Sequence, residues 1–312
     1  MKKVLITGGA GYLGSTLTEL LLSKGYKVDV LDDLSLRQTP LFHLCYNENF
    51  NLIQADVTNS EYLVSIVSEY DIIIPLAAIV GAPACDANKE LATKVNFGHI
   101  KVIVDNLKPE QKLRMPNTNS QYGSSDKIIT EDSPFNPLSH YAKTKCDAEN
   151  YIMNSGNGIC FRLATVFGSS PRMRTDLLVN DFVHKAINDG YLVLFQSHFK
   201  RNYIHVKDIA NTFLFGIENY DKMNNDVFNV GLSTANLSKR ELADKVKEYI
   251  PKLVIVENDF SSDFDNRNYI VSNDKLESYG WKPTHTIDSG IVELIKAYKM
   301  IINHNNREFT NL

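Results

Sequence analysis

A tyrosine and a lysine stand four residues apart in the segment Tyr141-Ala142-Lys143-Thr144-Lys145. Segment 139–154 has apolar residues at helical spacing, so Tyr141 and Lys145 are predicted to share one helix face. A free tyrosine, with a pKa of about 10, is a poor base at neutral pH, and a neighbouring ammonium lowers that pKa. A phenolate here could take the proton of a substrate hydroxyl while hydride leaves the same carbon. A surface helix with a packed aromatic residue would show the same spacing, so the assignment depends on the other motifs.

A glycine-rich segment, Thr7 to Gly14 (TGGAGYLG), follows the first predicted strand and opens a helix. In that context the backbone approaches a pyrophosphate, and the helix N-terminus points amide groups at its charge. The second predicted strand ends in Asp32-Asp33, whose carboxylates accept hydrogen bonds from the adenosine ribose hydroxyls and repel a 2′-phosphate. The sequence therefore predicts NAD, rather than NADP, as the cofactor. The residues predicted to bind it are Gly8, Gly11, Tyr12, Leu13, Gly14, Asp32, Asp33, Asp56, Val57, Leu76, Ala77, Ala78, Tyr141 and Lys145.

Two further polar residues complete the predicted catalytic set. Thr118 lies just after the fifth predicted strand. Ligands bind at the carboxyl ends of the strands in an open α/β sheet, so the Thr118 hydroxyl is expected to contact the substrate oxygen. Asn96, in Val95-Asn96-Phe97, is expected to brace Lys145 through the backbone or a water molecule. The predicted catalytic residues are Thr118, Tyr141, Lys145 and Asn96.

The elements that must hold these residues alternate between strand-like and helix-like segments, which is typical of βαβ units on a parallel sheet. We predict strands at 3–7, 27–31, 51–55, 71–76, 111–115 and 158–162, with helices at 13–24, 59–69, 88–106 and 139–154. Beyond residue 165 we predict helices at 176–188, 207–219, 238–249 and 286–302, and strands at 192–195, 226–230 and 252–256. The predicted fold is α/β, a Rossmann-type doubly wound parallel sheet with a smaller C-terminal α/β domain. Residues 1–165 would hold NAD and the catalytic residues, and residues 166–312 the substrate, with the two domains partly interleaved.

Composition and charge argue against several other classes of protein. The 312 residues are 43% hydrophobic, and 33 basic against 37 acidic residues give a net charge of −4. We therefore expect neither nucleic-acid nor anionic-membrane binding. The first apolar run breaks at Gly8, and no apolar stretch approaches the ~20 residues that span a bilayer, so a cytoplasmic location is expected. The four cysteines and eight histidines lack metal-ligand spacing, so we expect no metal site, no disulfide framework and buried free thiols.

These motifs together resemble the extended short-chain dehydrogenase/reductases, the group of sugar-nucleotide 4-epimerases, 4,6-dehydratases and decarboxylases. The resemblance runs through TGGAGYLG, ADVTN, PLAA, VNF, YAKTK, RLATVFG, RNYIHVKDIA, FNVG and GWKP. It implies a Ser/Thr-Tyr-Lys catalytic set, a nucleotide-sugar substrate and a homodimer formed through helices 88–106 and 139–154. It also implies that Arg201 and Arg267 contact the diphosphate of the substrate, whereas the sugar pocket lies along segments 79–85 and 172–180. The remaining predicted substrate-binding residues are Val80, Gly81, Asn119, Ser120, Arg174 and Asn180.

Within that family the 4,6-dehydratases carry an Asp-Glu pair directly after the catalytic Ser/Thr, and here Asn119 and Ser120 take its place. An amide and a hydroxyl cannot act as that acid and base near neutral pH, so dehydration is not expected. The segments NTNSQYG, SPRMRTDLLVNDF and IVGAPACD are similar to members that oxidise C4 of a GDP-heptose for capsule or surface polysaccharide. A 4-epimerase or a 4-keto reductase would use the same catalytic residues, and a non-catalytic NAD(H)-sensing protein on this fold stays a remote alternative.

Overall fold

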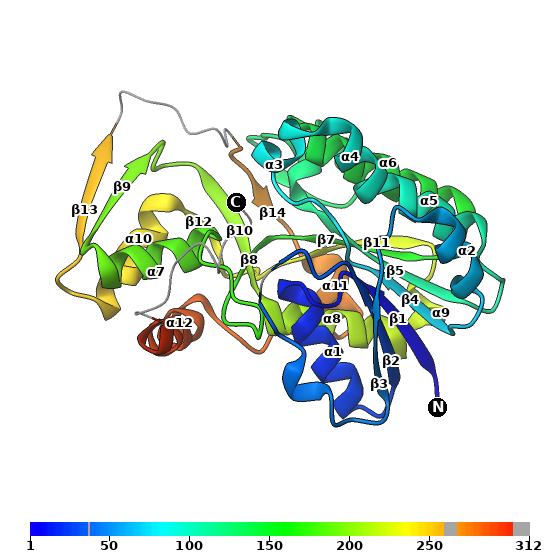
Figure 1. Cartoon of the computed structure of the whole chain (residues 1–312). Helices are drawn as coiled ribbons and strands as arrows, with labels where there is room; N and C mark the ends of the chain where they lie inside the picture. Colours follow the sequence, from blue (N-terminus) through cyan, green and yellow to red (C-terminus); the bar gives the residue numbers. More distant parts are fainter. Residues whose placement is uncertain (37, 259–266, 302–312) are drawn as a thin grey trace.

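The computed structural model describes residues 1–36, 38–258 and 267–301. Its larger layer is a seven-stranded sheet in which every pairing is parallel, with the order β11-β7-β5-β4-β1-β2-β3 (Figure 1). Its strands are β1 (Lys3–Thr7), β2 (Lys27–Asp32), β3 (Phe50–Gln54), β4 (Ile72–Pro75), β5 (Lys112–Thr118), β7 (Ile159–Leu163) and β11 (Asp226–Val230). The chain order reverses between β1 and β4, which is where doubly wound sheets bind ligands. The predicted Rossmann-type sheet is confirmed.

Helices cover both faces of this sheet, so each face has its own apolar core. One face packs against α2 (Ser60–Val67), α5 (His99–Asp105) and α6 (His140–Ser155), with Leu63, Ile103 and Ile152 in its core. The other face packs against α1 (Tyr12–Ser23) and α8 (Val206–Glu218), which contact each other, with Leu17 and Phe213 in its core. Strands enclosed in this way need apolar residues on both sides, and all four residues of β4 are buried.

The helix predicted over 88–106 is divided into three parts. The structure has α4 (Lys89–Thr93), a π-helical turn (Lys94–Gly98) and α5, preceded by the short helix α3 (Ala82–Ala87). The apolar spacing of the segment predicted one uninterrupted helix. A π-helical turn takes in an extra residue without ending the helix, and such turns are frequent at functional sites. This one carries Asn96.

The second half contains the predicted helices as α7 (Leu178–Asn188), α8, α10 (Lys239–Tyr249) and α12 (Ile287–Ile301), although residue 302 lies outside the described residues. The predicted strand at 192–195 is β9 (Tyr191–Phe195), and the one at 252–256 is β13 (Val254–Asn258); the two pair in parallel. A small mixed sheet, which the sequence did not predict, is formed by β8 (Thr165–Phe167), β10 (Lys200–His205) and β12 (Asn236–Ser238). A two-residue pairing joins β6 (Ile128–Ile129) to β14 (Ile270–Val271).

Strand β11 and helix α8 come from the second half of the chain but belong to the large sheet and to its covering layer. The two domains predicted on either side of residue 165 are therefore interleaved, since β11 and α8 from the second half pack with the first. All four cysteines are free thiols, and Cys85, Cys146 and Cys160 are buried, as predicted for at least three of them. None of the helices within the described ranges combines the length and the apolar character that crossing a membrane requires.

Candidate active site

The glycine-rich turn between β1 and α1 has no space for side chains. Gly8 has φ +70°, and a Cβ there would lie 2.6 Å from the backbone nitrogen of Ala77. A Cβ on Gly14 would lie 2.5 Å from the Gly8 carbonyl oxygen. Helix α1 starts at Tyr12 after the N-cap residue Gly11, with no side-chain cap and no acidic residue in its first turn, so its N-terminal amides remain available to an anion. This backbone cradle fits the pyrophosphate of a dinucleotide.

Asp32 is tied to the same turn. Its Oδ2 accepts a hydrogen bond from the backbone nitrogen of Ala10 at 2.9 Å, and its Oδ1 accepts one from Leu34 at 2.9 Å. Burial raises the pKa of Asp32, while these two backbone hydrogen bonds lower it. Each carboxylate oxygen has a further lone pair, so the group still suits ribose hydroxyls. Asp33 is exposed, and its Oδ1 accepts from the Ser35 nitrogen at 2.9 Å within its own loop.

The other predicted cofactor residues follow β3 and β4. Val57 is buried in the apolar core, and Asp56 accepts a hydrogen bond from the Thr58 nitrogen at 2.8 Å. Leu76 is fixed by its nitrogen, which donates to the Thr7 carbonyl oxygen at 2.9 Å. Ala77 and Ala78 are half-buried directly after it, on the opposite side of the switch point from the glycine turn. The Tyr12 hydroxyl donates to the carbonyl oxygen of Gly168 at 2.6 Å, and the part of Tyr12 in cofactor binding stays a prediction.

Thr118 and Tyr141 are neighbours at the carboxyl end of the sheet. Thr118 is the last residue of β5, and its side chain lies near enough to Tyr141 to lower the pKa of the tyrosine. Helix α6 begins at His140, where the Ser139 hydroxyl caps it by accepting from the Ala142 nitrogen at 3.2 Å. Tyr141 therefore lies in the first turn, and Lys145 follows one turn later, buried with 4% of its surface exposed. The structure brings the predicted threonine and tyrosine together and places the lysine on the same helix.

The electrostatics of Tyr141 correct one expectation. Burial raises the pKa of Tyr141 to about 12 and the Cys85 thiol adds to this, whereas Arg267, Arg174 and the Thr118 side chain lower it. The sequence assigned this lowering to Lys145, but the cations that counter the burial are the two arginines. A bound nicotinamide ring would add positive charge beside the phenol and favour the phenolate further.

Lys145 carries a stability cost that its replacement would remove. Burial lowers the pKa of Lys145 to about 8, from 10.5. Below pH 8 the Lys145 amine is protonated in both the folded and the unfolded chain, so the full cost of the buried charge is present. Between pH 8 and 10.5 this amine is protonated mainly in the unfolded chain, so the free energy of unfolding rises with pH. We expect Lys145→Met to stabilise the cofactor-free protein at pH 7 by a few kcal/mol, with an advantage that shrinks toward pH 10.5. Urea unfolding across this pH range measures it, and an advantage independent of pH would contradict it.

The side chain of Asn96 is hydrogen-bonded to Ile79 and Thr144, whereas it was expected to brace Lys145. Its Nδ2 donates to the Ile79 carbonyl oxygen at 3.0 Å and to Thr144 Oγ1 at 3.2 Å, while its Oδ1 accepts from the Ile79 nitrogen at 2.8 Å. The side chain thus connects the loop after β4 to the catalytic helix at the residue before Lys145. The thiol of Cys85 also bonds Ile79, at 3.2 Å, and burial raises the pKa of Cys85, which disfavours a reactive thiolate.

Two predicted substrate residues lie beside this catalytic group. Asn119 has 1% of its surface exposed, and neither atom of its amide has a hydrogen-bond partner among the described residues. A buried amide without partners is costly, so this side chain suits a polar ligand. Ser120 is bound to Thr118, whose hydroxyl donates to Ser120 Oγ at 3.0 Å. Val80 and Gly81 lie in the loop after β4, Val80 exposed and Gly81 at φ +94°.

The predicted substrate-binding residues in the second half of the chain differ in where their side chains lie. Arg267 and Arg174 have their charges near Tyr141, and Arg174 also pairs with Asp176 at 3.0 Å. Arg201 is buried with its guanidinium 5.5 Å from the centre of the Tyr269 ring. The expectation for Asn180 is corrected. It is fully buried, and its amide bonds the backbone of Gly168 and Arg174, so it fixes a loop and offers no surface to a sugar.

A buried ion pair under the catalytic helix was not predicted. Glu149, one turn after Lys145, accepts from Arg162 Nη2 at 2.5 Å and Nε at 3.1 Å, and also from Asn117 Nδ2 at 2.5 Å. Gln121, which is buried, donates to the same carboxylate at 3.2 Å. A polar residue at a buried position needs a polar partner, and Glu149 provides it.

The fold also brings together His205, His285 and Glu293, although the histidines are scattered in the sequence. The two imidazole rings are stacked, with centroids 4.1 Å apart and planes 9° from parallel. The lone pairs of imidazole nitrogens lie in the ring planes, so parallel rings cannot direct them at one tetrahedral ion. We therefore describe the group as a polar network and return to it below.

Comparisons with known proteins show the family and the fold. The NAD dependent epimerase/dehydratase family matches residues 4–231. UDP-glucuronic acid decarboxylase 1 of Danio rerio is 26% identical over 97% of this chain and 74% of its own. Among solved structures, UDP-glucose 4-epimerase of Thermotoga maritima with UDP-glucose has a TM-score of 0.85, with 22% identity over 96% of this chain and 100% of that one. A dTDP-glucose 4,6-dehydratase of Bacillus anthracis in complex with NAD has a TM-score of 0.83, with 20% identity over 99% of this chain and 100% of that one.

Proposed function

This chain belongs to the NAD dependent epimerase/dehydratase family, and from that membership we propose that it oxidises C4 of a GDP-linked heptose to the 4-keto sugar. The enzyme is NAD-dependent and modifies a nucleotide sugar. The observation that carries the proposal is the placement of Thr118 beside Tyr141 at the carboxyl end of the sheet, with Lys145 on the same helix. The GDP-heptose assignment is supported by the segments NTNSQYG, SPRMRTDLLVNDF and IVGAPACD.

In this reaction Tyr141 takes the proton of the C4 hydroxyl, and Thr118 holds the oxygen through its own hydroxyl. The C4–H bond breaks as a hydride, and the bound cofactor supplies the acceptor for it. The proton on Tyr141 and the hydride account for the two hydrogens lost when the alcohol becomes a ketone. Arg174 and Arg267 favour the phenolate form of Tyr141 before the transfer.

Asn119 and Ser120 support oxidation without water loss. Their amide and hydroxyl groups can orient the sugar but do not exchange protons near neutral pH. A 4-epimerase or a 4-keto reductase would use the same catalytic residues, so the three outcomes differ only in the product released. We further propose that the protein is a homodimer formed through residues 88–106 and helix α6; within one chain Phe97, on the π-helical turn, packs edge to face on Tyr151 of α6, with ring centroids 5.9 Å apart.

The nucleotide is tested by thermal unfolding of the NAD-loaded protein with GDP, UDP, dTDP, CDP or ADP at equal concentration. A ligand that binds only the folded state raises the midpoint, and at about 100 times its Kd it adds about 2.7 kcal/mol, or several degrees. We expect a selective rise with GDP, which justifies an assay of the GDP-heptose for a 4-keto product. A selective rise with UDP or dTDP would contradict the GDP-heptose assignment and favour a 4-epimerase.

A further inference from the structure

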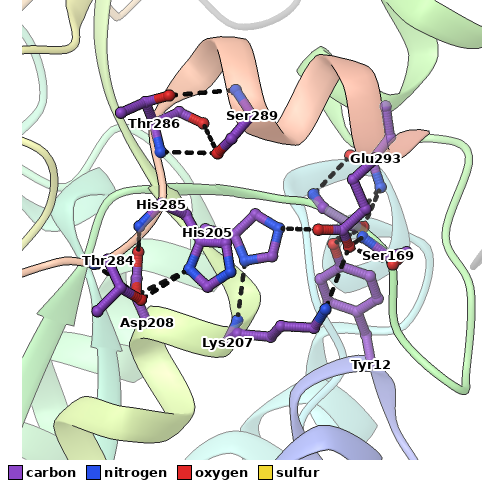
Figure 2. Close-up of polar contacts among 12 residues, drawn as sticks. Tyr12, Ser169, His205, Lys207, Asp208, Thr284, His285, Thr286, Ser289 and Glu293 are labelled. Atoms are coloured by element: carbon purple, nitrogen blue, oxygen red, sulfur yellow. Dashed lines mark hydrogen bonds and ion pairs between the residues drawn. The ribbon is translucent and has the colours of Figure 1, made fainter. Parts of the chain in front are cut away.

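The carboxylate of Glu293, on α12, is surrounded by positively charged and hydrogen-bond-donating groups (Figure 2). Its Oε1 accepts hydrogen bonds from both the backbone nitrogen of Ser169, at 3.0 Å, and the Ser169 hydroxyl. Its Oε2 faces His205 Nε2 at 3.2 Å, and Lys207 Nζ lies 3.7 Å from Oε1. Burial alone would raise the pKa of Glu293, but His205 and Ser169 hold it at about 2. Glu293 is therefore an anion throughout the physiological pH range.

His205 is fixed in one orientation behind this carboxylate. Its Nδ1 accepts from the backbone nitrogen of Lys207 at 3.2 Å, which assigns the ring proton to Nε2, the nitrogen that lies 3.2 Å from Glu293 Oε2. His285 stacks on the other side of the ring and places its Nδ1 3.0 Å from Asp208 Oδ1 (Figure 2). Gly168 packs so closely that a Cβ there would lie 2.3 Å from His205 Nε2. His205 and the groups that hold it thus fix the position of the Glu293 carboxylate, and this carboxylate fixes the backbone at Ser169.

Loop 168–176, which Glu293 holds at Ser169, lies against the start of the cofactor helix. The Ser170 hydroxyl donates to the Tyr12 carbonyl oxygen at 2.6 Å and lies 3.0 Å from Ser15 Oγ. In return, the Tyr12 hydroxyl donates to the Gly168 carbonyl oxygen at 2.6 Å. One end of this loop is therefore bound to α12 and to the first turn of α1 together.

The other end of loop 168–176 contains Arg174, whose positive charge acts on Tyr141. The carbonyl oxygen of Arg174 accepts from Asn180 Nδ2 at 2.7 Å, and Asn180 also accepts from the Gly168 nitrogen at 3.0 Å. The side chain of Asn180 thereby spans the two ends of the loop, so a shift at Gly168 moves Arg174 as well. Arg174 in turn is one of the charges that act on Tyr141.

We propose that Glu293 is a positioning residue, which fixes loop 168–176 between the cofactor helix and the nucleotide-sugar site and so holds Arg174 in place beside Tyr141. The inference rests on the proposed function for the identity of the ligand. The assignment concerns a residue in the last helix, more than 110 residues from the loop that it holds. Because its contacts are with the loop backbone and side chain, Glu293 acts through that loop and not on the substrate.

The test compares Glu293→Gln with Asp288→Asn, a matched control on the same helix whose carboxylate pairs with Lys245 at 3.0 Å. Calorimetric titration of the NAD-loaded proteins with GDP and with UDP gives the affinity, and kcat against pH gives the state of Tyr141. We expect Glu293→Gln to weaken binding about tenfold, as for the loss of a charge-assisted hydrogen bond. The acidic limb of its kcat profile is expected to move to higher pH, because Arg174 then stabilises the phenolate less. Asp288→Asn is expected to match the wild type in both.

The outcomes separate this inference from the proposed function. Wild-type protein that binds none of GDP, UDP, dTDP, CDP and ADP contradicts the nucleotide-sugar assignment on which both depend. Wild-type protein that binds one of them, with Glu293→Gln equal to it in affinity and pH profile, overturns the positioning role alone. If Glu293→Gln does not fold, Ser169→Ala decides, since it removes one donor to Glu293 and keeps the carboxylate. A smaller loss of affinity with the same direction of pH shift supports the inference, and an unchanged Ser169→Ala overturns it.

Discussion

Replacing Tyr141 with phenylalanine is expected to slow hydride transfer about a thousandfold while the protein still binds NAD normally. The change removes only the hydroxyl that would take the substrate proton, and the ring keeps its place in the first turn of α6. The glycine turn and Asp32, which form the cradle for the dinucleotide, are untouched. Single-turnover formation of NADH, followed by absorbance with the nucleotide sugar selected by thermal unfolding, measures the rate. Titration with NAD measures the affinity.

Tyr151→Phe is the matched control for this experiment. Tyr151 lies on the same helix, and its hydroxyl donates to Asp105 on α5, away from Thr118. Its loss is expected to leave the rate of hydride transfer unchanged. An unimpaired Tyr141→Phe protein would contradict an oxidoreductase altogether and leave an NAD(H)-sensing protein as the better explanation. A rate that falls equally in both variants would point to damage of the helix.

Glu149→Ala is expected to lower the free energy of unfolding by about 3–5 kcal/mol. Glu149 and Arg162 are both buried, with 1% and 4% of their surfaces exposed, and the guanidinium donates to the carboxylate through two nitrogens. Removing the carboxylate leaves a buried positive charge without its counter-ion, which costs far more than a surface pair is worth. Urea unfolding at constant salt measures the loss.

Asp147→Ala provides the comparison, because Asp147 pairs with Lys143 at 2.8 Å on the exposed side of the same helix. Exposed pairs of this kind contribute about 0–1 kcal/mol. Losses of similar size in the two variants would contradict the claim that burial makes the Glu149–Arg162 pair important. The experiment also bears on catalysis, since Glu149 is one turn from Lys145 and on the same helix as Tyr141.

The large sheet was predictable because each of its strands can be recognised from its own residues. Runs such as Ile72-Ile73-Ile74 are apolar without alternation, and the amphipathic segments between them have the helical period. The short strands β6 and β14 carry no such signal. Ile128 pairs with Ile270 across 142 positions, and a two-residue pairing is decided by where the rest of the fold brings the segments. The π-helical turn at Asn96 carries no such signal either, and the partners of its side chain, Ile79 and Thr144, lie in other segments.

The residues of the candidate site also differ in how far the sequence alone could place them. Tyr141 and Lys145 are four residues apart on one helix, and the glycine turn is contiguous, so both could be found from spacing alone. Asn180 could not be placed correctly, because its partners are backbone groups of a loop that the sequence does not reveal. His205, His285 and Glu293 come from three segments with no regular spacing. The high pKa of Tyr141 depends on burial, which only the packed structure determines.

The position of β11 has a consequence for how the chain is synthesised. This strand, residues 226–230, is the edge strand of the large sheet next to β7, at residues 159–163. A ribosome must therefore make more than 60 further residues after β7 before that strand gains its second neighbour. Until then β7 presents unpaired backbone groups and apolar side chains, the kind of edge that joins to other chains. A fragment ending near residue 165 would keep this edge permanently, so a self-standing cofactor module cut from this protein has to extend through Val230.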